Sequence, residues 1–126
     1  MEEAPLPTTI TSKEEISESF EIKQEKYNYK LNVKIVEQDI TLDLINQKEF
    51  MKDYEKKLSL DELKKMHRVF FALNSCKEFV DYLKALIENN KLSIRGIAEN
   101  KIYIELNVEY LFKQNIIIIN LFQKKN

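Results

Sequence analysis

The chain has 126 residues, which fits one domain, and 44% of them are apolar, enough for a core of that size. Its 20 basic and 21 acidic residues nearly cancel to a net charge of −1, which argues against a dedicated nucleic-acid surface. A single cysteine excludes an internal disulfide framework, and the longest apolar run, Ile116–Ile119, is too short to span a bilayer.

Residues 1–17 are predicted to form a flexible acidic tail. Pro5 and Pro7 prevent regular strand pairing there, and Thr, Ser and acidic residues dominate the rest of the segment. No apolar stretch typical of a secretory signal follows Met1, so, together with the lone cysteine, a reducing and cytoplasmic location is expected. Residues 18–126 are predicted to form one globular head domain.

Alternating apolar and polar residues predict three strands between residues 19 and 44. Their inward positions are Phe20, Ile22, Tyr27, Tyr29, Leu31, Val33, Ile35, Ile40, Leu42 and Leu44. Because the links between these runs are short, with a turn expected at Gln38–Asp39, an antiparallel meander is favoured. Residues 46–57 carry many charges and are predicted to form a surface connection, either a short helix or an extra edge strand.

Two helix-start signals lie in the middle of the chain. Ser59–Glu62 and Ser75–Glu78 each match a capping box, in which each side chain accepts a hydrogen bond from the backbone N–H of the other residue. The helices are predicted over residues 60–73 and 77–88. Their apolar stripes contain Leu63, Met66, Phe70, Phe71, Leu73, Phe79, Val80, Leu83, Leu86 and Ile87. The short link between the helices predicts an αα-hairpin whose stripes pack on each other and on the sheet.

Strands resume after the helical pair. Alternation predicts strands over residues 92–95 and 101–108, with a turn over 96–100 between them. The unbroken run Ile116–Ile119 begins a last strand, and such a run is typical of a strand covered on both faces. The predicted fold is therefore α+β: an antiparallel β-sandwich or curved sheet of about six to seven strands, with a helix-turn-helix inserted between the third and later strands.

The sequence does not predict an enzyme. A single glycine rules out a glycine-rich phosphate loop, and His67 lacks the further ligands that a metal site needs, so it is interpreted as a partly exposed helix residue. Cys76 begins the second helix: either the helix dipole activates its thiol, or it is a small half-buried residue of the capping box. No catalytic residue, cofactor, metal or small-molecule substrate is expected.

Large apolar residues occur in the predicted loop over residues 110–115. Loops normally carry polar residues, so exposed aromatic side chains there are candidate anchors for a partner. Tyr103 lies on the polar phase of its strand, either under the helices or exposed to a partner. The predicted protein-interaction residues are Tyr103, Tyr110, Leu111 and Phe112. The alternative is that the last two strands are longer and that Phe112 packs across them.

Two segments carry a resemblance to a known superfamily. The second helix contains Phe79-Val80-Asp81-Tyr82-Leu83-Lys84-Ala85-Leu86-Ile87, and the last hairpin contains Phe112-Lys113 followed by Ile116, Ile118, Asn120 and Phe122. With the strand order and the inserted helical pair, residues 20–122 resemble the head domains of the superfamily that contains the centriolar cartwheel protein and the end-joining DNA-repair scaffold proteins. Those heads are β-sandwiches clasped by a helix-turn-helix and followed by a coiled-coil stalk. No heptad pattern follows the last predicted strand here, and residues 46–57 have no counterpart.

The resemblance implies a non-enzymatic assembly module of a cytoskeletal, centriolar or basal-body scaffold. In cartwheel heads an apolar residue of this hairpin inserts into a pocket of a partner head and builds a ring, and the corresponding residue here is Phe112. The expected partners are proteins, including a second copy of this chain, rather than membranes or nucleic acid. The alternative is a monomeric adaptor that binds a peptide on a sheet edge or in a groove between helix and sheet.

Overall fold

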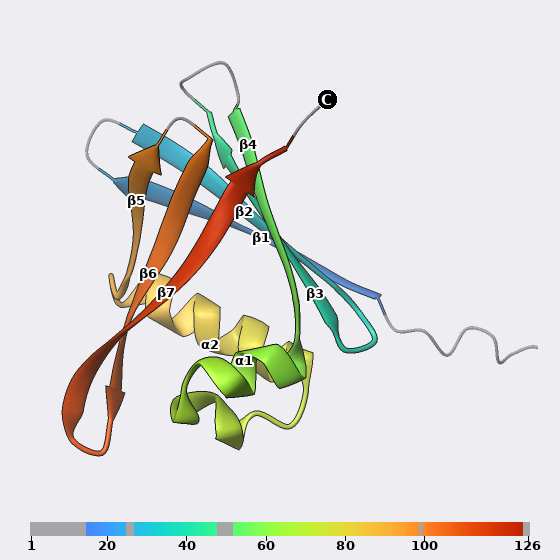
Figure 1. The fold of residues 1–126 in the computed structure, drawn as a ribbon, viewed down its shortest axis with the longest axis vertical. Coiled ribbons are helices and arrows are strands. Elements are labelled where there is room, and N and C mark those ends of the chain that lie inside the picture. Colours follow the sequence, from blue (N-terminus) through green and yellow to red (C-terminus); the bar gives the residue numbers. More distant parts are fainter. Residues whose placement is uncertain (1–14, 25–26, 48–51, 99, 125–126) are drawn as a thin grey trace, which may run out of the picture.

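In the described part of the chain, seven strands form one curled antiparallel sheet (Figure 1). The structure is a computed structural model that describes residues 15–24, 27–47, 52–98 and 100–124. The strands are β1 (Glu15–Gln24), β2 (Tyr27–Val36), β3 (Asp39–Asn46), β4 (Lys52–Ser59), β5 (Leu92–Ala98), β6 (Lys101–Tyr110) and β7 (Lys113–Gln123). Between β4 and β5 come α1 (Leu60–Met66), the 3₁₀ helix η2 (Arg68–Ala72) and α2 (Cys76–Glu88).

The sheet has the form of a half-barrel whose two halves meet between β4 and β7. Its strand order is β1-β2-β3-β4-β7-β6-β5. The outermost strands also approach each other, because the Gln24 side chain accepts a hydrogen bond from the Ile94 N–H at 2.8 Å and donates one to the Ile94 carbonyl at 2.5 Å. The α+β class and the curved antiparallel sheet are confirmed, but as one continuous sheet rather than two separately stacked ones.

The core fills the concave side of the sheet. The predicted alternation is confirmed in β2, β3 and β6, whose inward residues are Tyr29, Leu31, Val33, Ile35, Ile40, Leu42, Leu44, Ile102, Ile104, Leu106 and Val108. Helix α2 closes one end of the half-barrel, since it contacts β1 and β2 of one half and β5 and β6 of the other. This helix agrees with the prediction, and its buried face contains Phe79, Val80, Leu83 and Leu86.

Of the alternatives predicted over residues 46–57, the extra strand is confirmed as β4, but this strand lies between β3 and β7 rather than at an edge of the sheet. It pairs with β3 along its whole length, and Tyr54 and Leu58 are buried. The abundance of charged residues hides the period of two, because Lys56 occupies an inward position opposite Leu42. The helical pair consequently follows the fourth strand, while residues 48–51 lie outside the described part of the chain.

Strand β1 begins earlier than the sequence predicts. Residues 15–17, assigned to the acidic tail, pair with Lys34–Val36 of β2, and the Glu15 carboxylate lies 3.5 Å from the Lys34 amine. The polar side chains at the start of β1 hid this extension, because only one face of an edge strand needs apolar residues. The rest of the tail predicted over residues 1–17, residues 1–14, lies outside the described residues.

The single helix predicted over residues 60–73 is wrong, although its start is correct. Ser59 Oγ accepts from the Glu62 N–H at 3.2 Å, and the Glu62 carboxylate accepts from the Ser59 N–H at 2.8 Å, as a capping box requires. The helix then ends at Met66, and His67 is extended before η2 begins. This break lets the Phe70 side chain point into the core. Its ring packs edge-on against the Phe79 ring, with the two centroids 5.8 Å apart.

In the second capping box, the glutamate side chain accepts its hydrogen bond from a different backbone N–H than expected. Ser75 Oγ accepts from the Glu78 N–H at 3.3 Å, but the Glu78 carboxylate accepts from the N–H of Asn74 rather than of Ser75. The two N–H groups are still satisfied at the helix start, so α2 begins where the sequence predicts.

The isoleucine run in β7 is covered on one face only, contrary to the prediction. Ile117 and Ile119 are buried against the core, whereas Ile116 and Ile118 are 53% and 48% exposed. The reason is that the helices lie on the concave side of the sheet, so nothing in the described residues covers the convex side of β7.

Candidate functional site

The β6–β7 hairpin ends in a two-residue turn made of Leu111 and Phe112 (Figure 1). The strands are longer than the predicted loop 110–115 allowed, since Tyr110 pairs directly with Lys113. Phe112 nevertheless does not pack across them: it is 96% exposed, and Leu111 is 70% exposed. The structure therefore holds two large apolar side chains in water at the end of a rigid ribbon.

The backbone of this turn is unfavourable for the residues that form it. Leu111 has φ 53° and Phe112 has φ 66°, the positive pair that a type I′ turn needs and that Asn-Gly usually supplies. For a residue with a bulky Cβ substituent, this region costs on the order of 1–2 kcal/mol. Neither turn propensity nor burial accounts for Leu and Phe at these positions, so we interpret them as residues kept for contact with a partner.

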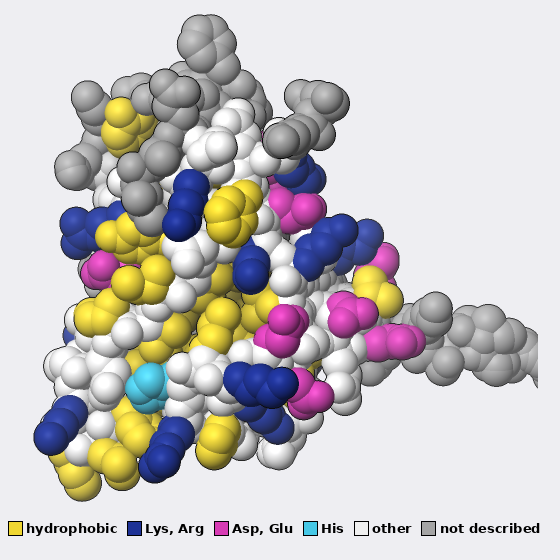
Figure 2. Space-filling model, in the orientation of Figure 1, with side chains coloured by type: hydrophobic (Ala, Val, Ile, Leu, Met, Phe, Trp, Pro, Cys, Tyr) yellow, Lys and Arg dark blue, Asp and Glu magenta, His cyan; other side chains and the backbone are white. Residues whose placement is uncertain are grey.

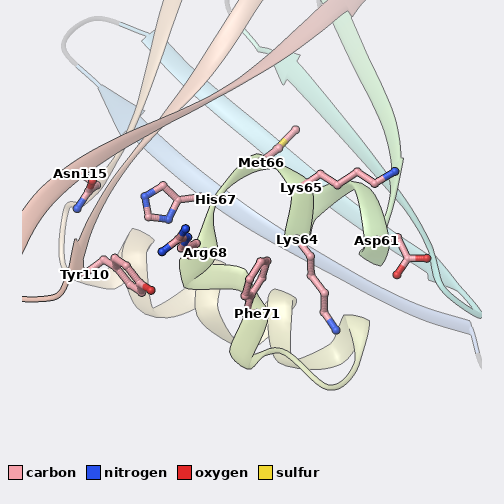
Figure 3. Close-up of a pocket in the computed structure, with 9 residues that line it drawn as sticks. All are labelled: Asp61, Lys64, Lys65, Met66, His67, Arg68, Phe71, Tyr110 and Asn115. Carbon is pink, nitrogen blue, oxygen red and sulfur yellow. The ribbon is translucent and has the colours of Figure 1, made fainter.

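A groove lies beside the stem of the same hairpin, between it and the α1–η2 break. Its volume is about 830 Å³, within the range of binding pockets. Its apolar and aromatic lining comes from Met66, His67, Phe71 and Tyr110. Figure 3 shows Tyr110 and Asn115 on the hairpin side of the groove, with Phe71 and Lys64 on the helical side.

His67 joins the two sides of this groove. Its Nδ1 accepts a hydrogen bond from the Val69 N–H at 3.0 Å and caps η2, so the neutral ring carries its proton on Nε2. Its ring meets Tyr110 edge-on, with centroids 5.4 Å apart. His67 is partly exposed as predicted, but it lies at a helix break rather than inside a helix, and it fixes the groove against the hairpin stem.

The rim of the groove is basic. Lys64, Lys65 and Arg68 line it against one acid, Asp61. Within the described ranges, no carboxylate lies close enough to these three cations to form an ion pair. An apolar floor with an uncompensated basic rim is suited to an apolar side chain or segment with acidic neighbours.

The structure brings three of the four predicted interaction residues together. Tyr110 lines the groove, and Leu111 and Phe112 follow it at the tip. Tyr103 is half-buried on the convex side of β6 between Arg95 and Asn120, and roughly 26 Å of strand separates it from Leu111 of the tip at about 3.3 Å per residue.

Sequence reasoning missed the other side of the groove. Phe71 was assigned to the core with Phe70, but only Phe70 is buried and Phe71 is exposed beside the groove. Met66 was also placed on a core stripe and is exposed. The sequence alone did not separate Phe70 from Phe71, because adjacent helix residues can both be buried, as Phe79 and Val80 are in α2.

A second polar cluster lies at the other end of β7. The Lys124 amine is 3.6 Å from carboxylate oxygens of Asp53 and Glu55 and 3.9 Å from Asp43. Burial, followed by the hydrogen bond and the charge of Asp53, raises the pKa of Asp43 from 3.8 to about 7. The Asp43 carboxyl therefore titrates near neutral pH, and the three side chains together hold Lys124 at the end of β7.

The remaining candidate chemistry is limited. Burial, followed by the charge of Asp39, raises the pKa of the Cys76 thiol, which favours the half-buried structural interpretation over an activated nucleophile. Across the described ranges, no three His, Cys, Asp or Glu side chains are grouped to hold a metal ion. Nor does any helix in this part of the chain have the length and apolar character needed to cross a membrane.

Comparisons with protein-family models and with curated proteins find no match to this chain. Its function is therefore inferred from the apolar tip and the groove themselves.

Proposed function

We propose that this chain is a non-enzymatic interaction module that self-associates through its last hairpin. Phe112 of one copy would enter the groove between the hairpin stem and α1–η2 of another copy. The observation that carries the proposal is the tip itself: a phenylalanine exposed to 96% on a turn whose positive φ angles disfavour it.

The chemistry of the groove suits such a guest. Met66 and Phe71 offer exposed apolar surface, and the aromatic ring of Tyr110 forms one side. Burying a phenylalanine side chain gains roughly 2–3 kcal/mol, and sulfur–aromatic contact with a methionine adds a few tenths or more. Because association itself is costly, a contact built on one or two such side chains would be weak, of micromolar affinity or worse.

The positions of tip and groove favour reciprocal exchange. Tyr110 lines the groove only two residues before Phe112, so the donor and the acceptor lie at the same end of the molecule, where Figure 1 shows the β6–β7 hairpin and α1. Two copies related by a two-fold axis could each insert a tip into the other, which doubles the buried apolar area. If several copies were linked in a larger assembly, each tip would have a high effective concentration near a groove, which would strengthen the weak contact further.

The resemblance noted from the sequence adds a biological setting to this proposal. A module of this kind would serve a cytoskeletal, centriolar or basal-body scaffold, with protein partners and no cofactor. A helical insertion before three returning strands and an apolar hairpin before the last strand support that assignment.

Sedimentation equilibrium over a wide concentration range tests the proposal. The unmodified chain should show a concentration-dependent rise in average mass, and Phe112→Glu should remain monomeric with an unchanged circular dichroism spectrum. Phe122→Glu is the matched control, because Phe122 is 51% exposed but lies at the opposite end of β7, and it should associate like the unmodified chain.

Two results would contradict the proposal. If Phe112→Glu associates normally, the tip is not the contact. If the unmodified chain stays monomeric at millimolar concentration, the alternative function, a monomeric peptide-binding adaptor, is favoured instead.

A further inference from the structure

Strand β7 has a free edge along most of its length. It pairs with β6 from Lys113 to Phe122, but with β4 only through Tyr54–Gln123 and Glu55–Phe122. Figure 1 shows the two strands diverging from this junction, with β4 running to α1 and β7 running to the hairpin tip. No strand within the described ranges pairs with the other side of residues 113–121.

The register identifies the backbone groups on this edge. In a two-residue hairpin, the pair that flanks the turn, Tyr110 and Lys113, exchanges backbone hydrogen bonds, and hydrogen-bonded pairs then alternate along the ladder. The N–H and C=O groups of Asn115, Ile117 and Ile119 therefore point to β6. Those of Gln114, Ile116, Ile118 and Asn120 point away from it, toward the free edge.

This edge lacks the usual protection against strand pairing. Natural edges are blunted by charged residues, proline, bulges or short length. Strand β1 has exposed charged residues on both faces, Glu18 on the core side and Glu21 on the other, and β5 has an irregular register between Gly96 and Ala98. The free part of β7 is regular and centred on four isoleucines, and Figure 2 shows hydrophobic side chains in the hollow between the hairpin and the helical end of the molecule.

The residues around the free edge of β7 also indicate what kind of segment would pair with it. The groove next to this edge is apolar, and its rim carries Lys64, Lys65 and Arg68 against the single acid Asp61. An acidic segment would neutralise these cations.

We infer that the free edge of β7 binds an extended segment of another protein by strand addition, and that this segment alternates apolar residues with acidic ones. The backbone groups of Gln114, Ile116 and Ile118 provide the ladder, Ile116 and Ile118 contact apolar side chains of the segment, and its acids meet the basic rim. The edge is separate from the Phe112 tip, although its basic rim also borders the groove proposed to receive the tip of a second copy.

Amide hydrogen exchange measured by NMR tests the inference on the unmodified chain. Without ligand, the amides of Ile116 and Ile118 should exchange fast, and those of Ile117 and Ile119 slowly. A synthetic peptide of about ten residues that alternates valine and glutamate should slow exchange at Ile116 and Ile118. The same peptide with lysine in place of glutamate should bind at least roughly tenfold more weakly.

A matched pair of variants tests the backbone contact. Ile118→Pro removes an N–H that points to the free edge and so leaves the β6 ladder intact, and it should abolish binding of the glutamate peptide. Ile118→Ala keeps that N–H and should weaken binding only a few-fold. Phe112→Glu should bind the peptide normally, which separates this surface from the proposed self-association.

The inference is overturned if the glutamate peptide does not slow exchange at Ile116 and Ile118, or if Ile118→Pro binds it as well as Ile118→Ala. Should Ile118→Pro fail to fold, the exchange measurement on the unmodified chain decides alone, since it needs no substitution.

Discussion

Two hairpins of this sheet each turn in two residues with opposite chemistry, and their backbones differ: φ is positive at both residues of the β6–β7 turn but only at Glu37 in the β2–β3 turn. The β2–β3 hairpin turns at Glu37–Gln38 and the β6–β7 hairpin at Leu111–Phe112, each in two residues between paired strands. Glu37 also has a positive φ, 60°, but both residues of its turn are polar. The fold therefore accepts an ordinary solvated turn, and folding does not explain the apolar pair at the other turn, which we propose to contact a partner.

Replacing the apolar tip with the turn sequence that its backbone prefers should give the largest effect. Leu111→Asn combined with Phe112→Gly relieves both unfavourable φ angles, so the free energy of unfolding should rise by roughly 1–3 kcal/mol. Self-association should be lost at the same time. Urea unfolding and sedimentation measure the two properties, and a less stable variant would contradict the interpretation of the tip.

The charged cluster at the other end of β7 should produce a smaller, pH-dependent effect. The pKa of Asp43 is raised from 3.8 to about 7, so between these pH values the folded chain holds a proton that the unfolded chain releases. The free energy of unfolding should therefore fall as pH rises from about 4 to 7. The expected fall is on the order of 1–2 kcal/mol, because the partly exposed carboxylate and nearby Lys124 reduce the full effect of the shift.

Asp43→Asn provides the control for this prediction. It removes the titrating group, so the variant should lose this pH dependence and be more stable than the unmodified chain at pH 7. Unfolding curves at a series of pH values measure both. An unchanged slope in Asp43→Asn would show that another group titrates.

Changing the polar turn should have the smallest effect. Glu37→Gly removes the strain of a positive φ but raises the entropy of the unfolded chain, so the two contributions nearly cancel. The free energy of unfolding should change by no more than roughly 0.5 kcal/mol, with self-association unaffected. A loss of self-association in this variant would mean that the two turns are not functionally different.

The parts of the fold that the sequence predicted well are those where one local pattern dominates. Alternation located β2, β3 and β6, and the capping serines located the starts of α1 and α2. Strand β4 was predicted only as one of two alternatives, because its charges mask the alternation around Tyr54. The α1 break was missed because the requirement to bury Phe70 comes from the packing of distant elements.

One part of the candidate site, the hairpin tip, was predicted from the sequence, and the other part, the groove, was not. The tip was visible in the sequence, since Leu111 and Phe112 are out of place in any loop. The groove was not, because Phe71 and Tyr110 come from segments far apart in the chain and meet only in the folded molecule. The exposure of Ile116 and Ile118 depended on which side of the sheet the helices cover, which periodicity alone does not reveal.

Mixing two variants is the most direct test of tip-in-groove association. Phe112→Glu keeps an intact groove, and Phe71→Glu keeps an intact tip, so each alone should be monomeric by sedimentation equilibrium. An equimolar mixture should form heterodimers, because one productive insertion is restored. A mixture that stays monomeric while both variants are folded, or association of either variant by itself, would contradict the account.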